Sequence, residues 1–112
     1  MPAAWRPALG EIVDQLVRGD GSQGRHIKRL EPVSDVVWSQ CRDALEDYGD
    51  VDFISLPATS WETSVCQRRG ERWFCHIDLW TTQEGRSDLV LEVSVREEVD
   101  GPRFTVELAY VP

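Results

Sequence analysis

The chain has 112 residues and a mass of 12.8 kDa, and its 12 Lys and Arg against 20 Asp and Glu give a formal net charge of −8. A chain of this length can bury about two thirds of its unfolded surface, which is enough for one core and leaves no room for a second domain. Near-average apolar and charged fractions exclude disordered and fibrous classes, and no apolar run reaches the ~20 residues of a membrane span.

We therefore expect a single domain over residues 1–112. The N-terminus lacks the basic and then apolar pattern of a signal peptide, and three cysteines leave an odd one in any disulfide scheme. Both features favour a reducing cytoplasm. The acidic balance repels phosphate backbones, so we expect neither a nucleic-acid nor a membrane partner.

Two helices are expected in the first half of the chain. Apolar residues at spacings of three and four predict a helix over 7–18, and Gly19 favours its end there. Ser34 is a suitable cap for a second helix over 34–48, which carries one apolar stripe and ends before Gly49. The connection between the two helices has no apolar period and is expected to be a mobile loop.

After Gly49 the apolar period changes to two, which predicts strands. The predicted strands span residues 51–56, 61–69, 72–80, 88–96 and 103–111. Gly70 and Glu71 favour a two-residue type II′ turn between the second and third of them. That turn places Cys66 opposite Cys75, Val65 opposite His76, Thr63 opposite Asp78 and Trp61 opposite Trp80.

The last two strands form a second predicted hairpin. Pro102 cannot donate a ladder hydrogen bond, which favours a four-residue loop over 99–102. The apolar faces of the two strands then agree, because they pair Leu91 with Tyr110, Val93 with Leu108 and Val95 with Val106.

Together these elements predict an α+β fold, in which two N-terminal helices pack on a four- to five-stranded antiparallel meander sheet that can curve into a cone. The order of elements resembles that of cystatin-like folds, which include nuclear-transport-factor-like and ketosteroid-isomerase-like domains. This resemblance implies the shape of the sheet and carries no function with it.

The most specific segment runs from Ile77 to Val93 and reads IDLWTTQEGRSDLVLEV. Together with LVRGD at 16–20, EDYG at 46–49 and the terminal strand from Phe104, it resembles a family of small uncharacterised bacterial domains that share an LWT and EGRSDL centre. The resemblance implies the order of elements and a bacterial setting. It implies no catalytic residue.

One candidate site is a pocket on the sheet, formed by Trp61, His76, Asp78 and Trp80. The predicted register places them on one face, where a buried Asp beside a His could perform acid–base chemistry among aromatic rings. The alternative is structural, with the two tryptophans stacked across the strands and the polar pair bonded locally or facing water. Cys66, Cys75 and His76 do not have the spacing of the two CxxC motifs that hold a structural zinc ion, so we expect no metal and no cofactor.

The EGRSDL loop is a second candidate, with Glu84, Gly85, Arg86, Ser87 and Asp88. Arg86 either presents its guanidinium to an anionic group or is held by a neighbouring carboxylate, and we favour the second. No glycine-rich nucleotide loop and no nucleophile elbow occurs in the sequence.

The third candidate is a partner-binding surface at the end of the second helix and the strand after it. It consists of Asp43, Glu46, Asp47, Asp50 and Asp52. Such a run is either a solvated face or a surface that steers a basic protein toward the chain. A short basic cluster between the helices, at Arg25, His26, Lys28 and Arg29, could contact an anion instead.

Small size, acidity and the lack of catalytic motifs favour a non-enzymatic binding protein. We expect it to neutralise or adapt a basic protein partner, as toxin-immunity proteins do. The alternative is a small-molecule-binding protein or enzyme that uses the Asp/His pocket. A homodimer that packs through the exposed face of the sheet is a third possibility.

Overall fold

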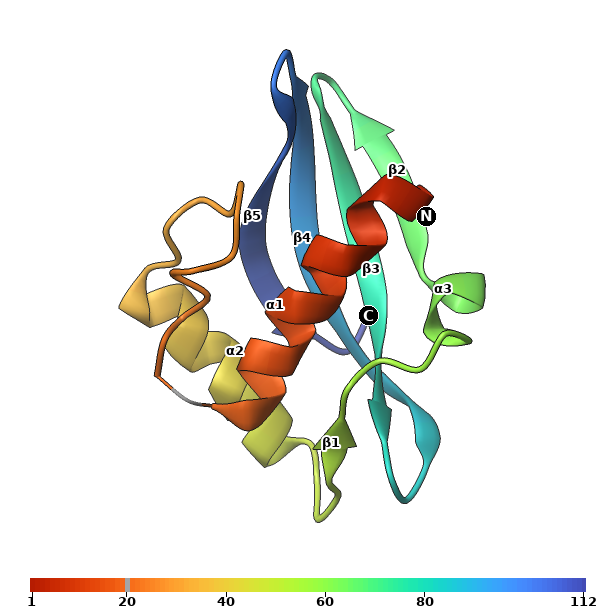
Figure 1. Cartoon of the computed structure of the whole chain (residues 1–112). Helices are drawn as coiled ribbons and strands as arrows, with labels where there is room; N and C mark the ends of the chain where they lie inside the picture. The colour runs from red at the N-terminus through yellow and green to blue at the C-terminus, as the bar shows by residue number, and fades with distance from the viewer. Residues whose placement is uncertain (20) are drawn as a thin grey trace.

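Figure 1 shows the computed structural model of the chain, which describes residues 1–19 and 21–112. Two helices come first and an antiparallel sheet follows, so the predicted α+β class and the order of helices before strands are confirmed. Asp20, the first residue of the predicted connection, lies outside the described residues.

Both predicted helices are present and begin and end close to the expected residues. A 3₁₀ helix η1 precedes them, and the bounds are Ala3–Trp5 for η1, Arg6–Arg18 for α1 and Asp35–Asp47 for α2. Gly19 ends α1 with a left-handed backbone at φ +63°, and its N–H donates to the carbonyl of Gln15. At the start of α2 the hydroxyl of Ser34 accepts a hydrogen bond from the Val37 N–H at 3.1 Å.

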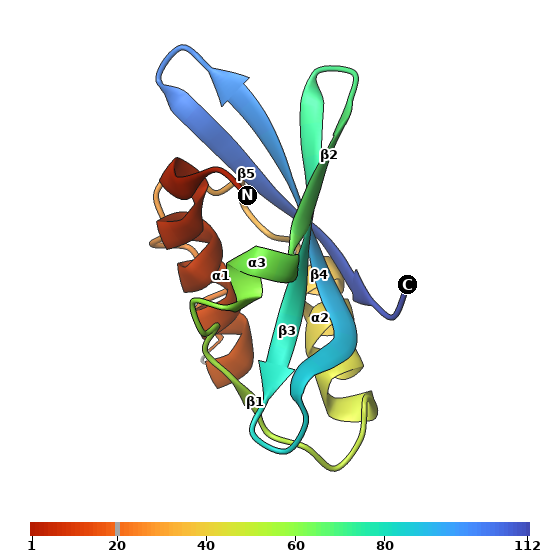
Figure 2. The ribbon, with the colours of Figure 1, turned by 90° about the vertical axis from the view of Figure 1, so that its right-hand side faces the viewer.

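The sheet has five antiparallel strands that curl into a half-barrel (Figures 1 and 2). They are β1 Phe53–Ile54, β2 Val65–Arg69, β3 Arg72–Thr81, β4 Gly85–Glu98 and β5 Gly101–Tyr110. Their order is β1–β3–β4–β5, and β2 pairs with β3 on the same edge that β1 uses. Helix α1 crosses one face of the sheet, and α2 lies beside β5.

The two faces of the sheet differ in what they carry. The covered face, which α1 crosses, holds the hydrophobic core, where Cys75, Ile77 and Leu79 of β3 are buried with side chains from both helices. The opposite face, called here the open face, carries the alternate residues of β3, which are Arg72, Phe74, His76, Asp78 and Trp80. None of these five is fully buried.

The predicted strand over 61–69 is wrong at its beginning, because Ser60–Thr63 forms the short helix α3. Two serine side chains there make the hydrogen bonds to the Asp78 backbone that a neighbouring strand would otherwise make. The Ser60 hydroxyl donates to the Asp78 carbonyl at 3.0 Å, and the Asp78 N–H donates to Ser64 Oγ at 3.1 Å. With these backbone groups satisfied by side chains, the chain has no need of a strand at this position.

The register of the first hairpin is therefore confirmed only in part. Cys66 pairs with Cys75 and Val65 with His76, as predicted. Gly70 has φ +64° at the turn, as a type II′ turn requires. The predicted strand pairs of Thr63 with Asp78 and of Trp61 with Trp80 do not form, because both partners on that side belong to α3.

The predicted strand over 51–56 is present only as β1, because its two residues pair with Trp80 and Thr81 at the end of β3. The other strands are longer than predicted or shifted by a residue or two, most of all β4, which the sequence placed at 88–96. Among the described residues, no helix combines the length and the apolar character needed to cross a membrane.

The predicted register between β4 and β5 is wrong. Glu98 pairs with Gly101, so the loop has two residues and not the four of 99–102. The Pro102 carbonyl accepts from Arg29 Nε at 3.3 Å, which shows that Pro102 faces the outer edge of the sheet, where its missing N–H costs no ladder bond. A bulge next to Glu92 shifts the register again, so the observed pairs are Leu91 with Ala109, Val93 with Val106 and Val95 with Phe104.

Candidate functional site

The four residues of the predicted sheet pocket do not lie together. Trp61 lies on α3 and packs against the core, with the Arg6 guanidinium 6.0 Å from the centre of its ring. Trp80 lies on the open face of β3 beside Gly85, whose added Cβ would stand 3.7 Å from the indole. The two indoles are therefore not a cross-strand stack.

The polar pair of this pocket is divided between two partners. His76 Nε2 lies 2.8 Å from Glu92 Oε1, and its ring meets Tyr110 edge to face at 6.2 Å between centroids. The Asp78 carboxylate accepts a hydrogen bond from the Thr63 hydroxyl. Each group is thus bound locally, as the structural alternative expects, and they do not form an acid–base pair with each other.

The two cysteines of the first hairpin lie on the covered face. Their Sγ atoms are 2.8 Å apart, and burial raises the pKa of the Cys75 thiol far above its ordinary value. His76 follows Cys75 on the same strand and so points to the open face. The three side chains therefore cannot act as one ligand set.

The EGRSDL loop is held by Tyr48 from the end of α2. The Tyr48 hydroxyl donates to Glu84 Oε1 at 2.9 Å and accepts from the Asp88 N–H at 3.0 Å. Arg86 is exposed and makes no ion pair with any described residue, so the favoured Arg–carboxylate pair is not formed.

Within this loop Gly85 and Ser87 have structural roles. Gly85 adopts φ +75° at the turn into β4. The buried Ser87 hydroxyl donates to the Leu79 carbonyl at 2.7 Å and accepts from the Leu89 N–H at 3.1 Å. It fills the bulge at which the pairing of β3 with β4 changes register.

The predicted acidic surface is exposed along its whole length and is called here the acidic face. It consists of Asp43, Glu46 and Asp47 on α2, and Asp50 and Asp52 in the segment before β1. A shallow depression of about 610 Å³ lies along α2 and is lined by Asp35, Val36, Ser39, Gln40, Asp43, Ala44 and Asp47. Val36 is 79% exposed there, so the depression offers an apolar contact beside its carboxylates.

The nearest cation does not neutralise the acidic face. Arg42 donates to the Leu16 carbonyl at 2.8 Å at the end of α1, and it reaches only Glu46, at 3.3 Å. Asp52 accepts a hydrogen bond from the Gln83 amide at 2.9 Å. Asp43, Asp47 and Asp50 make no ion pair with any residue in the described part of the chain.

The sequence reasoning missed one group of residues, the arginines at the tips of the two hairpins. Arg69, Arg72, Arg96 and Arg103 are successive partners across four strands, and we call them the arginine row. The predicted register paired Arg96 with Thr105 and so dispersed the row. The signal in the sequence was the presence of arginines next to both turns. These arginines align across the strands only when the second loop has two residues.

The family described as a domain of unknown function (DUF7668) matches residues 13–112 of the chain. No curated protein and no solved structure matches the chain significantly. The matched range covers residues 13–18 of α1, all of α2 and the whole sheet, so it includes the acidic face, the EGRSDL loop and the arginine row.

Proposed function

The chain belongs to the family described as a domain of unknown function (DUF7668), and we propose that it is a non-enzymatic binding protein whose acidic face engages a basic protein partner. The proposal places it in a bacterial cytoplasm, where its thiols stay reduced. There it would neutralise or adapt the partner, as an immunity protein does.

The observation that carries the proposal is the uncompensated charge of the acidic face. Asp43 and Asp47 line the same depression on α2 and make no ion pair with any described residue, although the chain has 12 Lys and Arg. Their mutual repulsion is relieved when a cationic surface covers them, and such complementarity raises the rate of association. Exposed Val36 offers an apolar contact to such a partner within the same depression.

The alternative of a small-molecule pocket has less support. Trp61 and Trp80 lie apart, and His76 and Asp78 are bonded to different neighbours. A metabolite that co-purifies with the chain and raises its melting temperature in a saturable way would favour that alternative.

The proposal is tested with the tagged protein and its native lysate at low and high salt. The captured basic protein is identified by mass spectrometry, purified, and titrated against the wild type by calorimetry. We expect the triple variant Asp43→Lys/Glu46→Lys/Asp47→Lys to bind at least about tenfold more weakly, because each exposed charge contact contributes up to about 1 kcal/mol. The association rate of the wild type should fall as salt rises.

The matched control is Glu11→Lys/Glu62→Lys/Glu97→Lys. These three side chains are exposed on other elements, and the control has the same net charge as the test variant. Equal affinities of the two triple variants for the partner would show that only the overall charge matters, and the acidic face would be rejected as the binding surface.

A further inference from the structure

The arginine row brings four guanidinium groups together at one end of an acidic protein. Arg69 pairs with Arg72, Arg72 with Arg96 and Arg96 with Arg103, so all four side chains lie on the open face. Neighbouring strands are about 4.8 Å apart, and the row therefore spans roughly 14 Å. Like charges that face each other across strands destabilise a sheet, so an anion that contacts the row would relieve part of this repulsion.

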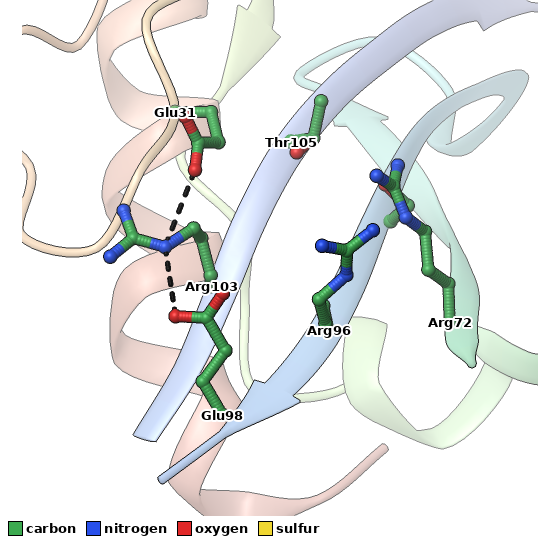
Figure 3. Close-up of a pocket in the computed structure, with 7 residues that line it drawn as sticks. Glu31, Arg72, Arg96, Glu98, Arg103 and Thr105 are labelled. Atoms are coloured by element: carbon green, nitrogen blue, oxygen red, sulfur yellow. Dashed lines mark hydrogen bonds and ion pairs between the residues drawn. The ribbon is translucent and has the colours of Figure 1, made fainter. Parts of the chain in front are cut away.

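Among the described residues, carboxylates pair with the row at one end only. Arg103 Nε lies 3.1 Å from Glu98 Oε1 and 3.3 Å from Glu31 Oε1 (Figure 3). The hydrogen bond from Arg103 lowers the pKa of the Glu98 carboxyl, which keeps that carboxylate ionised. Arg29 donates to the same carboxylate at 3.0 Å.

The middle of the row has no such partner. Arg72 and Arg96 make no ion pair with any residue that the structure describes, although the chain contains 20 Asp and Glu. Figure 3 shows the two side chains near each other on adjacent strands, apart from the Glu31, Arg103 and Glu98 group. Arg69 lies over the ring of Phe74 at 5.1 Å from its centre.

A small hollow lies between these side chains. Its volume is about 90 Å³, and it is lined by Glu31, Arg72, Ser94, Arg96, Glu98, Arg103 and Thr105. Ser94 and Thr105 are direct partners in the register, and they place two hydroxyl groups one row away from the arginines. The volume is far below the roughly 300–1,000 Å³ of sites for drug-sized ligands, so the hollow admits only a compact group.

From this geometry we propose that the hollow is a binding site for a phosphoryl group, either as inorganic phosphate or as the terminal phosphate of a small monoester. Guanidinium groups from three strands approach the same space, and each offers N–H donors in a planar fork. A carboxylate is satisfied by one such fork, whereas a phosphoryl group has three oxygens that can accept from several arginines at once. The site lies on the open face and does not depend on the acidic face.

The test is calorimetric titration of the whole chain with inorganic phosphate and, separately, with glycerol 2-phosphate, in chloride buffer of constant ionic strength. We expect saturable binding of at least one of them, and which one binds identifies the source of the phosphoryl group. Arg72→Gln/Arg96→Gln should weaken that binding at least about tenfold. Removing two like charges from the row should not lower its melting temperature, so a loss of binding would not reflect unfolding.

The matched control is Arg25→Gln/Lys28→Gln, which removes the same charge from the exposed basic cluster between the helices. Its affinity should equal that of the wild type. Amide chemical shifts measured during the titration should change near residues 72, 94–96 and 103–105. No binding above chloride, equal losses in the two double variants, or shift changes located elsewhere would each overturn the proposal.

Discussion

A single buried thiol connects the packing of the helices to the pH dependence of stability. Cys41 on α2 is 0% exposed, and its burial raises the pKa of the thiol from 9.0 to about 11, although a backbone hydrogen bond with Ala109 acts in the opposite direction. The folded state therefore keeps the thiol protonated at a pH at which the unfolded chain releases the proton.

The sign of the effect follows from this difference. Below about pH 9 both states hold the proton, and the contribution of Cys41 to stability is complete. As the pH rises toward about 11, ionisation stabilises the unfolded chain, so we expect the free energy of unfolding to fall by about 2–3 kcal/mol. Urea unfolding across this range measures it. Cys41→Val should show a decline that is smaller by this amount, because buried Cys75 still contributes a decline of its own. Identical pH profiles for the two proteins would contradict the prediction.

At the scale of elements, β4 depends on one hydroxyl. Ser87 is 4% exposed and satisfies both the Leu79 carbonyl and the Leu89 N–H inside the bulge. In Ser87→Ala these two backbone groups would be buried without partners, so we expect unfolding to become easier by about 1–3 kcal/mol.

Chemical denaturation of Ser87→Ala measures this loss, with Ser55→Ala as the control because Ser55 is exposed. The control should remain within about 0.5 kcal/mol of the wild type. If both variants were equally stable, the bulge would not depend on the hydroxyl of Ser87.

The helices could be predicted from the sequence because their signals are local. The cap at Ser34 and the stop at Gly19 lie within a few residues of the turns they control. The predictions of the strand at 61–69 and of the second hairpin were wrong because the residues that determine these structures are distant in sequence. Ser60 bonds to Asp78, and Pro102 is tolerated because its carbonyl meets Arg29 on the outer edge of β5.

The same distinction applies to the candidate sites. The acidic face lies within ten residues of sequence on one helix and the segment after it, so local reasoning placed its side chains together at the surface. The arginine row combines residues from four strands, and a register error of one or two residues hides it. The predicted pairing of Trp61 with Trp80 was wrong because it depended on a strand at Trp61, where the chain forms a helix instead.

At the scale of the whole molecule, the arginine row and the acidic face lie at opposite ends of the long axis. The hairpin tips that carry the arginine row lie at the end opposite to the last turn of α2 and β1, where the acidic face is found (Figure 1). An anion at one end and a basic protein at the other can therefore bind without sharing a residue. Sites that far apart with no common partner are expected to act additively.

The outer edge of β5 is one of the two edges of the sheet through which copies of the chain could associate. Phe104 exchanges backbone hydrogen bonds with Arg29 and Glu31, and Ala109 exchanges two with the side-chain amide of Gln40, at 2.6 and 3.0 Å. These contacts occupy the groups through which an edge strand would pair with a second copy. The net charge of −8 also opposes association.

We therefore expect the wild type to be a monomer, with light scattering giving 12.8 kDa at every concentration up to the millimolar range. Gln40→Ala frees the N–H and carbonyl of Ala109 beside exposed Leu108, so this variant should show a mass that rises with concentration and faster hydrogen exchange at the Ala109 amide. A wild type that scatters as a dimer would mean that association uses another surface, such as the open face, and that the capped edge does not decide the oligomeric state.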